Sequence, residues 1–288
     1  MPKVLITGAT GQLGQAAAAR LKAAGFEVRA LARRPEGLRG VAVDEPVTGD
    51  LTKPETLVGI CQETDVVLSC AGASMNVNAF GDRRSFYEVD YQGNINLLRE
   101  AARAGVGKFV YVSLAGGESL RRTVYADAHE RFVDDLRASG IPSTVVRPTG
   151  FFSFHLELLK FASKGRGLVI GDGERRTNPV HEVDVAAACV EAATRDASDR
   201  PDLIVGGPEV FTRRETVEMA FAALGRKPSL MTLSPGVFSA MISPLKLINR
   251  RIHALMDFGI AVTQQDLVAP AYGAHRLQDY YEQAAKAL

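Results

Sequence analysis

The chain has 288 residues, 46% of them hydrophobic, which is enough to bury a substantial core in one large domain or two small ones. Lysine and arginine total 34 against 33 aspartate and glutamate residues, for a net charge of +1. This balance excludes a global attraction to nucleic acid or to an anionic membrane. The three cysteines lie far apart in apolar sequence, which favours reduced thiols. Because neither a signal peptide nor a run of about 18 apolar residues occurs, we expect a soluble, cytoplasmic protein.

The first half of the chain alternates short apolar runs with amphipathic stretches. Expected strands lie at 3–8, 27–33, 41–46, 65–72 and 108–116. Expected helices lie at 15–25, 53–62, 85–105 and 121–140. This alternation predicts an α/β fold with a doubly wound parallel sheet of the Rossmann type, covered by helices on both faces.

The regular alternation ends after residue 152. A turn-rich loop (171–180), a helix (181–195), a strand (202–207) and a further helix (212–224) are expected before a mostly helical tail. We therefore expect a Rossmann-type domain over residues 1–150, to whose sheet residues 171–206 return. Residues 151–170 and 207–288 would form a smaller, mostly helical lobe on the substrate side.

A glycine-rich loop joins the first expected strand to the first expected helix. In ITGATGQLG, the residues Gly8, Gly11 and Gly14 allow a tight turn and a close approach of the backbone to a ligand. Backbone N–H groups at the start of the helix can then bind a pyrophosphate. The position within a βαβ unit favours a dinucleotide site over a simple tight turn.

The end of the second expected strand selects the dinucleotide. An acidic side chain about 20 residues beyond the glycines would bind the ribose hydroxyls of NAD. This chain has Arg33 and Arg34 there, and guanidinium groups can neutralise and hydrogen-bond a 2′-phosphate. NADP(H) is therefore the predicted cofactor. NAD(H) stays an alternative because Glu36 is close in sequence, and a solvated loop with two ordinary charges would also explain the arginines.

These motifs resemble the short-chain dehydrogenase/reductase superfamily over nearly the whole chain. The resemblance is to its atypical, extended-like branch, which includes NmrA-like proteins and relatives of the nucleotide-binding accessory subunit of respiratory complex I. TGATGQLG is similar to the glycine motif of that family, which implies cofactor contacts by Thr10, Gln12 and Leu13 beside the glycines.

Two further segments carry the resemblance. GDLTKPETL is similar to the segment in which Asp50 and Leu51 would border the adenine. SCAGA resembles the strand end at which Ala71 and Gly72 would pass beside the cofactor.

The resemblance also implies catalytic residues. In catalytic members, a serine at the end of the fifth strand and a Tyr-x-x-x-Lys pair on the next helix converge on the substrate. Here Ser113 and Tyr125 occupy such positions, but His129 stands in place of the lysine. That lysine binds the nicotinamide ribose and lowers the pKa of the tyrosine from about 10. A histidine with a pKa near 6.5 can hydrogen-bond a ribose hydroxyl, but it is mostly uncharged at neutral pH.

Three interpretations of Tyr125 and His129 stay open. The pair works as a weakened acid/base system, with Ser113 orienting the substrate. Alternatively, NADP(H) binds without reaction and the protein acts as a redox sensor, regulator or assembly factor. In the third interpretation, Tyr125 is a packing residue and His129 is solvated beside Glu130.

Two other patterns have structural and functional explanations. His181 and Asp184 have spacing that a metal site would use, but no third ligand is near, so no metal is predicted. The stretch 237–258 mixes apolar residues with Lys246, Arg250 and Arg251. Packing of a small lobe, an apolar pocket wall and weak peripheral attachment to a membrane each explain it.

We therefore expect an NADP-dependent reductase of a small apolar carbonyl or quinone-like substrate. A catalytically silent regulator that binds NADP(H) and a protein partner is the alternative. Nucleotide-sugar epimerisation or dehydration is disfavoured because that chemistry uses a complete Tyr/Lys pair. No nucleic-acid partner and no transmembrane segment are expected.

Overall fold

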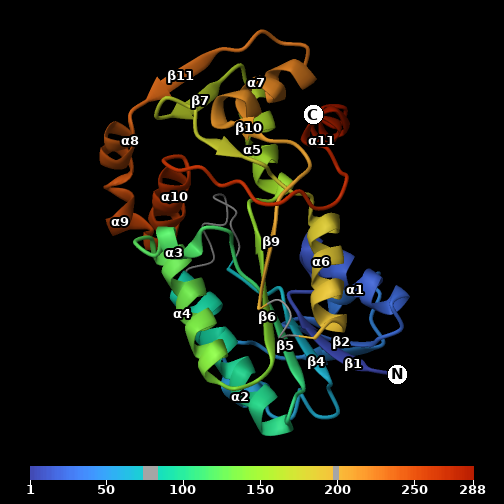
Figure 1. Ribbon diagram of the computed structural model, residues 1–288. Coiled ribbons are helices and arrows are strands. Elements are labelled where there is room, and N and C mark those ends of the chain that lie inside the picture. The colour runs from blue at the N-terminus through green and yellow to red at the C-terminus, as the bar shows by residue number, and fades with distance from the viewer. Residues whose placement is uncertain (74–83, 197–200) are drawn as a thin grey trace. The chain divides into compact units, whose positions relative to one another are not determined.

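The apolar runs of the first half form strands that pair into a seven-stranded sheet with the order β3-β2-β1-β4-β5-β6-β9 (Figure 1). Neighbouring strands from β3 to β6 run parallel. The computed structural model describes residues 1–73, 84–196 and 201–288. The strands are β1 (Lys3–Thr7), β2 (Glu27–Ala32), β3 (Glu45–Thr48), β4 (Val66–Ser69), β5 (Lys108–Val112), β6 (Ser143–Pro148) and β9 (Asp202–Val205). The predicted doubly wound α/β fold is confirmed.

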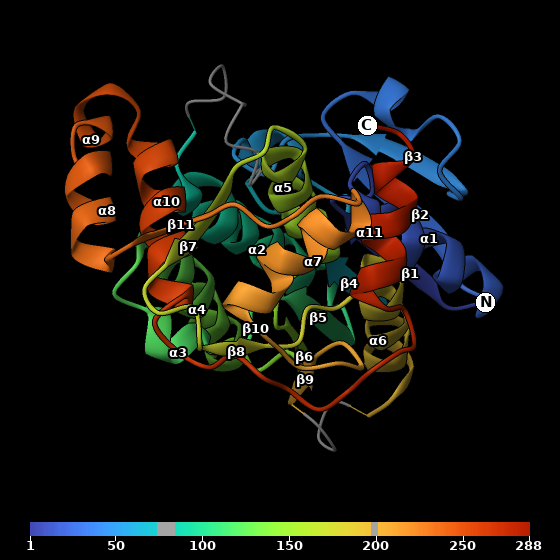
Figure 2. The ribbon, with the colours of Figure 1, turned by 90° about the horizontal axis from the view of Figure 1, so that it is seen from above.

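Helices cover both faces of this sheet (Figures 1 and 2). They are α1 (Gln12–Ala23) and α6 (Glu182–Thr194) on one face, and α2 (Asn94–Ala104) and α4 (Val124–Ala138) on the other. Shorter elements are the 3-10 turns η1 (Pro35–Leu38) and η2 (Pro54–Thr56), the π-helical segment η3 (Tyr87–Gly93) and the helix α3 (Gly117–Leu120). The strand order reverses between β1 and β4, so the carboxyl ends of these two strands mark the switch point of the sheet.

Two expected helices differ from the structure. The segment 53–62 forms only the turn η2, and Gly59, with φ of 79°, adopts a left-handed conformation that is incompatible with a continuing helix. The expected helix 85–105 begins with η3 before it continues as α2. Such π-helical segments occur frequently at functional sites.

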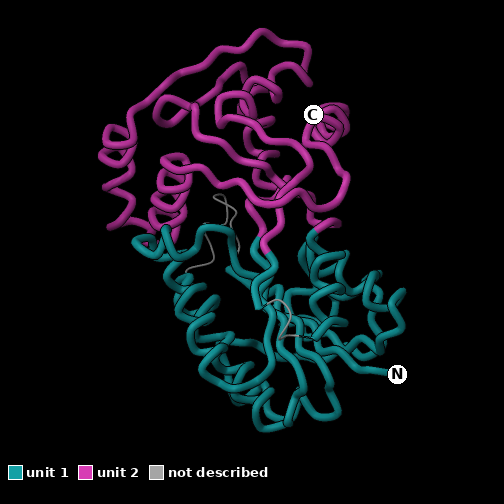
Figure 3. Tube along the Cα trace, in the orientation of Figure 1, with its two compact units in different colours: residues 1–147, 185–203 teal, residues 148–184, 204–288 magenta. Residues whose placement is uncertain are grey.

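The chain divides into two compact units (Figure 3). Unit 1 comprises residues 1–147 and 185–203, and unit 2 comprises residues 148–184 and 204–288. The sequence-based bounds group residues 171–184 with the sheet, whereas the structure groups them with unit 2. The reason is local pairing, because β8 (Arg176–Thr177) is antiparallel to β10 (Phe211–Thr212).

Unit 2 has its own apolar core between α5 (Phe152–Ser163), α7 (Arg213–Ala223) and α11 (Leu277–Ala285). Its other elements are β7 (Gly167–Ile170), β11 (Leu230–Leu233), α8 (Pro235–Ile242), α9 (Leu245–Ile248) and α10 (Arg250–Val262). No helix in the described ranges is long and apolar enough to cross a bilayer.

A buried ion pair joins α4 to β6 within unit 1. The Arg147 guanidinium donates to both carboxylate oxygens of Glu130, at 2.5 and 3.0 Å, and the Glu130 side chain is fully buried. Arg147 also contacts Asp202 of β9. A Cβ atom on Gly117 would lie 2.0 Å from Oε1 of Glu130, so only glycine leaves room for this carboxylate. The pair fixes α4 against the sheet.

The substitution Arg147→Met should destabilise the protein by about 3–5 kcal/mol, because it leaves the Glu130 carboxylate buried without its cation. The matched control is Arg131→Met, which removes an exposed ion pair with Asp127 on the same helix and should cost less than about 1 kcal/mol. Urea unfolding of both variants measures the difference. Equal decreases in the free energy of unfolding would show that the buried ion pair stabilises the protein no more than the exposed one.

Candidate functional site

The loop between β1 and α1 approaches its neighbours too closely for side chains. A Cβ atom on Gly14 would lie 2.2 Å from the carbonyl oxygen of Gly8. A Cβ atom on Gly8, where φ is 78°, would lie 2.6 Å from the backbone of Cys70 at the end of β4. Glycine is therefore required at both positions, one for helix packing and one for strand contact.

The start of α1 is open to an anion. Gly11 is the N-cap residue, so no side chain accepts the free N–H groups of the first turn, and that turn has no acidic residue. Gln12 is exposed and Leu13 is mostly buried. The N–H groups and the positive end of this 12-residue helix provide the charge that a phosphate requires.

A cavity of about 410 Å³ lies at the carboxyl ends of β1 to β4 in unit 1. Of the predicted cofactor residues, those that line it are Gly8, Thr10, Gly11, Arg33, Asp50, Leu51, Ala71 and Gly72. Five of the predicted residues lie outside the lining, namely Gln12, Leu13, Gly14, Arg34 and His129. The topology therefore brings together segments from four different strand ends at the switch point of the sheet.

Charged residues flank the cavity at the ends of β2 and β3. Arg33 is exposed and lines the cavity, whereas Arg34 is exposed away from it. Burial alone would raise the pKa of Asp50, but hydrogen bonds from the backbone and hydroxyl of Thr52, with Arg84 and Arg33 nearby, lower it overall. Arg84 also lines the cavity. Sequence reasoning missed Arg84, which no motif marks.

A buried polar chain connects the floor of the cavity to α2. The Thr7 and Ser69 hydroxyls lie 3.0 Å apart, and Ser69 donates to Oδ1 of Asn94 at 2.6 Å. Asn94 in turn donates to the backbone carbonyl of Asp90 in η3. Since Thr7 lines the cavity, these hydrogen bonds fix the position of a cavity residue.

Tyr125 lies in the first turn of α4 among aromatic rings. Its ring packs edge-on against Phe86 and His129, with centroids 5.1 and 4.7 Å away. Burial, and the nearby carboxylate of Asp90, raise the pKa of Tyr125 well above its usual range. Asp90 accepts a hydrogen bond from the backbone N–H of Ala73. The phenol is therefore a proton donor and not a base near neutrality.

His129 is buried and uncharged. Its Nδ1 lies 2.6 Å from the Tyr111 hydroxyl, whose pKa is raised well above 10 by burial. Burial and the positive charge of Arg147 lower the pKa of His129 to about 3. Tyr111 keeps its proton, and donation of that proton to Nδ1 would place the imidazole proton on Nε2. Among the described residues, this buried Nε2 has no hydrogen-bond partner. The interpretation of His129 as a solvated residue is wrong.

Ser113 lies at the end of β5, as the sequence predicts, but its hydroxyl points to the buried ion pair. It donates to Oε1 of Glu130 at 3.1 Å, and its side chain is buried. Within the described residues, neither Ser113, Tyr125 nor His129 lines the cavity at the strand ends.

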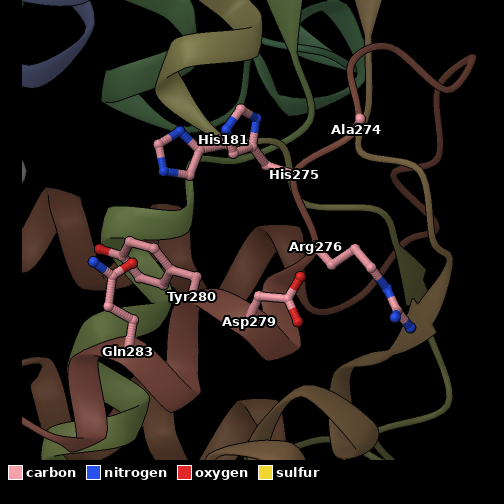
Figure 4. A pocket seen from close by; sticks show the side chains of 7 residues that line it. All are labelled: His181, Ala274, His275, Arg276, Asp279, Tyr280 and Gln283. Carbon is pink, nitrogen blue, oxygen red and sulfur yellow. The ribbon is translucent and has the colours of Figure 1, made fainter.

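A second, smaller cavity of about 240 Å³ belongs to unit 2 (Figure 4). The rings of His181 and His275 stack there with centroids 4.6 Å apart, and Nδ1 of His275 lies 2.8 Å from Oδ1 of Asp184. Nδ1 of His181 accepts the Val183 N–H, so its proton is on Nε2. The described residues contain no group of three metal ligands. Asp184 thus orients a histidine from the far end of the chain.

The substitution His129→Gln should make stability less sensitive to acid. The folded protein protonates His129 only below about pH 3, whereas the unfolded chain does so below about pH 6.5. The unfolded state binds more protons between these values, so the free energy of unfolding falls as the pH is lowered, by up to about 5 kcal/mol from this group. Glutamine keeps an acceptor for Tyr111.

Unfolding titrations between about pH 7 and pH 4 would measure the effect. His155 in unit 2 also has a pKa lowered to about 3 by burial and Arg213, so His155→Gln provides a second, independent case. Parallel curves for the native protein and His129→Gln would contradict a buried, uncharged histidine.

Comparisons with known proteins agree with this geometry. A family model described as NAD(P)H-binding matches residues 8–196. The chain is 26% identical to divinyl chlorophyllide a 8-vinyl-reductase of Oryza sativa subsp. indica, over 98% of this chain and 78% of that protein. It is 32% identical to (4-alkanoyl-5-oxo-2,5-dihydrofuran-3-yl)methyl phosphate reductase of Streptomyces griseus, over 77% of this chain and 74% of that protein.

A solved structure shares the fold. It is the NADPH-dependent quinone oxidoreductase of Escherichia coli in complex with NADPH, with a TM-score of 0.77, 19% identity, and coverage of 97% of this chain and 99% of that one. The family model covers well over half of the chain, and the family resemblance predicted from the motifs is confirmed. The chain belongs to the NAD(P)H-binding family within the short-chain dehydrogenase/reductase superfamily.

Proposed function

We propose that this protein is an NADPH-dependent reductase of a small, apolar carbonyl or quinone-like substrate. The observation that carries the proposal is the cavity at the switch point, where the free N–H groups of α1 and the Arg33 side chain border one space. This arrangement suits a dinucleotide with an additional phosphate. Reduced nicotinamide, when bound, supplies a hydride.

The cofactor preference rests on Arg33. Its guanidinium lines the cavity at the end of β2, where NAD-specific sites have an acid. Gly11, Thr10 and the first turn of α1 would hold the pyrophosphate, and Asp50 and Leu51 would border the adenine. Nε2 of His129 has no hydrogen-bond partner among the described residues. A ribose hydroxyl of the cofactor would provide that partner.

The proton chemistry favours reduction. A phenol with a raised pKa stays protonated, so Tyr125 would donate a proton to a substrate that accepts negative charge. Donation leaves a phenolate, which would take up a proton from solvent, because the uncharged His129 does not stabilise it. Abstraction of a proton from an alcohol would require the phenolate to be present beforehand, which the raised pKa disfavours. A conjugated or quinone-like acceptor suits this site because it delocalises negative charge before protonation.

The names of the relatives support reduction as the reaction class. They denote reduction of a vinyl group, of a dihydrofuranyl phosphate and of a quinone.

A silent NADP(H)-binding regulator is the second candidate. The uncharged His129 favours it, because the residue lacks the cation that activates the tyrosine in catalytic relatives. A further relative is the 40 kDa subunit of NADH-ubiquinone oxidoreductase from Neurospora crassa, which is 26% identical over 74% of this chain and 58% of that protein. The same missing cation disfavours an epimerase.

The substitution Arg33→Ser should weaken NADPH binding about tenfold, through loss of a charge-assisted hydrogen bond, and should leave NADH binding unchanged. Arg39→Ser is the matched control, since Arg39 is exposed on the same loop but does not line the cavity. Fluorescence titration with both dinucleotides measures the affinities. Equal binding of NADH and NADPH by the native protein would overturn the cofactor preference.

The substitution Tyr125→Phe should lower kcat for quinone or enone reduction about 100-fold while the Kd for NADPH stays the same. Tyr87→Phe is the control, because Tyr87 lies partly exposed on η3, away from the cavity lining. Consumption of NADPH with a panel of apolar acceptors provides the assay. If the native protein binds NADPH but oxidises it with no acceptor, the regulator becomes the better description.

A further inference from the structure

Two short helices of unit 2 leave most of their apolar side chains uncovered. In α8 only Ile242 is buried, and in α9 no residue is buried. Leu247 is 92% exposed and Ile248 is 78% exposed. Packing of a small lobe, which would explain an apolar tail, does not account for these two side chains.

The same segment has only positive formal charges. No aspartate or glutamate occurs between Glu218 and Asp257, although the whole chain has 33 such residues in 288. Lys246 and Arg250 are exposed next to the uncovered side chains, and neither forms an ion pair within the part of the chain that the structure describes. The uncovered apolar groups and the cations therefore belong to one stretch of chain that has no acidic residue.

We propose that this surface docks on an anionic lipid bilayer. It is termed the α8–α9 surface and consists of Val237, Met241, Lys246, Leu247, Ile248 and Arg250. Figures 1 and 2 both show α8 and α9 next to α10 at the margin of unit 2. The apolar side chains enter the boundary between headgroups and acyl chains, and the cations contact the lipid phosphates.

Charge favours a lipid surface over a second copy of the chain. A symmetric dimer through this surface would place Lys246 and Arg250 of one protomer near the same residues of the other, with no acidic residue of the segment to neutralise them. Anionic headgroups provide that neutralisation. Since α9 has four residues, it can lie in the interface but cannot cross the bilayer.

The chain has no tryptophan, so a single inserted tryptophan reports on one position. Leu247→Trp should show a blue shift in emission and protection from a soluble quencher when vesicles of phosphatidylcholine and phosphatidylglycerol are added. Vesicles of phosphatidylcholine alone should give a much smaller change. The control is Val58→Trp, at a 71% exposed apolar position of unit 1, which should not respond.

A charge variant tests the electrostatic part. Lys246→Gln with Arg250→Gln should weaken binding to the anionic vesicles about 10- to 30-fold, and added salt should weaken binding of the native protein. Arg39→Gln with Arg99→Gln, two exposed arginines of unit 1, should leave it unchanged. Circular dichroism verifies the fold of each variant.

Three outcomes would overturn the proposal. The first is no response of Leu247→Trp to anionic vesicles. The second is a blue shift that increases with protein concentration in the absence of lipid, which would indicate self-association. The third is a shift on addition of NADPH or an acceptor alone, which would indicate a lid. Emission reports insertion and not turnover, so the result is independent of the reductase proposal.

Discussion

The site depends on the absence of side chains where the β1–α1 loop meets its neighbours. Gly14 contacts Gly8, and Gly8 contacts the end of β4, at distances that no Cβ atom allows. This steric constraint brings the start of α1 to the switch point of the sheet, so its free N–H groups and the ends of four strands border one cavity. The proposed contacts to the pyrophosphate, the adenine and the 2′-phosphate follow from that placement.

Burial of charged and polar groups determines the protonation states of His129 and Tyr125. Glu130 and Arg147 form a buried pair that fixes α4 to the sheet, and the positive charge of Arg147 also lowers the pKa of the neighbouring His129. A lysine at position 129 would be desolvated and repelled by the same arginine. Burial and the charge of Arg147 therefore explain why an uncharged ring is compatible with this position. Burial and the nearby carboxylate of Asp90 keep Tyr125 protonated.

Local sequence predicts the parts of the site that are local in structure. Gly8, Gly11 and Arg33 belong to one continuous βαβ segment, so their spacing alone predicts where they meet. The role of Ser113 could not be predicted in this way, because its hydroxyl partner is 17 residues away on another element. The resemblance places Ser113 at the correct strand end, but only the packing shows that it contacts Glu130.

Contacts between segments that are distant in the chain also could not be predicted from the sequence. His275 and Asp184 are 91 residues apart, and no local pattern connects them. The segment 53–62 has good helix formers but forms mainly turns, because the left-handed Gly59 interrupts the helix. The exposure of Leu247 and Ile248 is likewise a property of the folded lobe, since an apolar run in sequence is equally consistent with burial.

The most direct test of the reductase is a single-turnover reaction of the protein–NADPH complex with a quinone, using NADPH deuterated at the transferable position. Hydride transfer within the site predicts that reduced nicotinamide disappears only when the acceptor is present, and more slowly with the deuterated cofactor. Persistence of bound NADPH with every acceptor tested would contradict the reductase and leave a binding protein without catalysis.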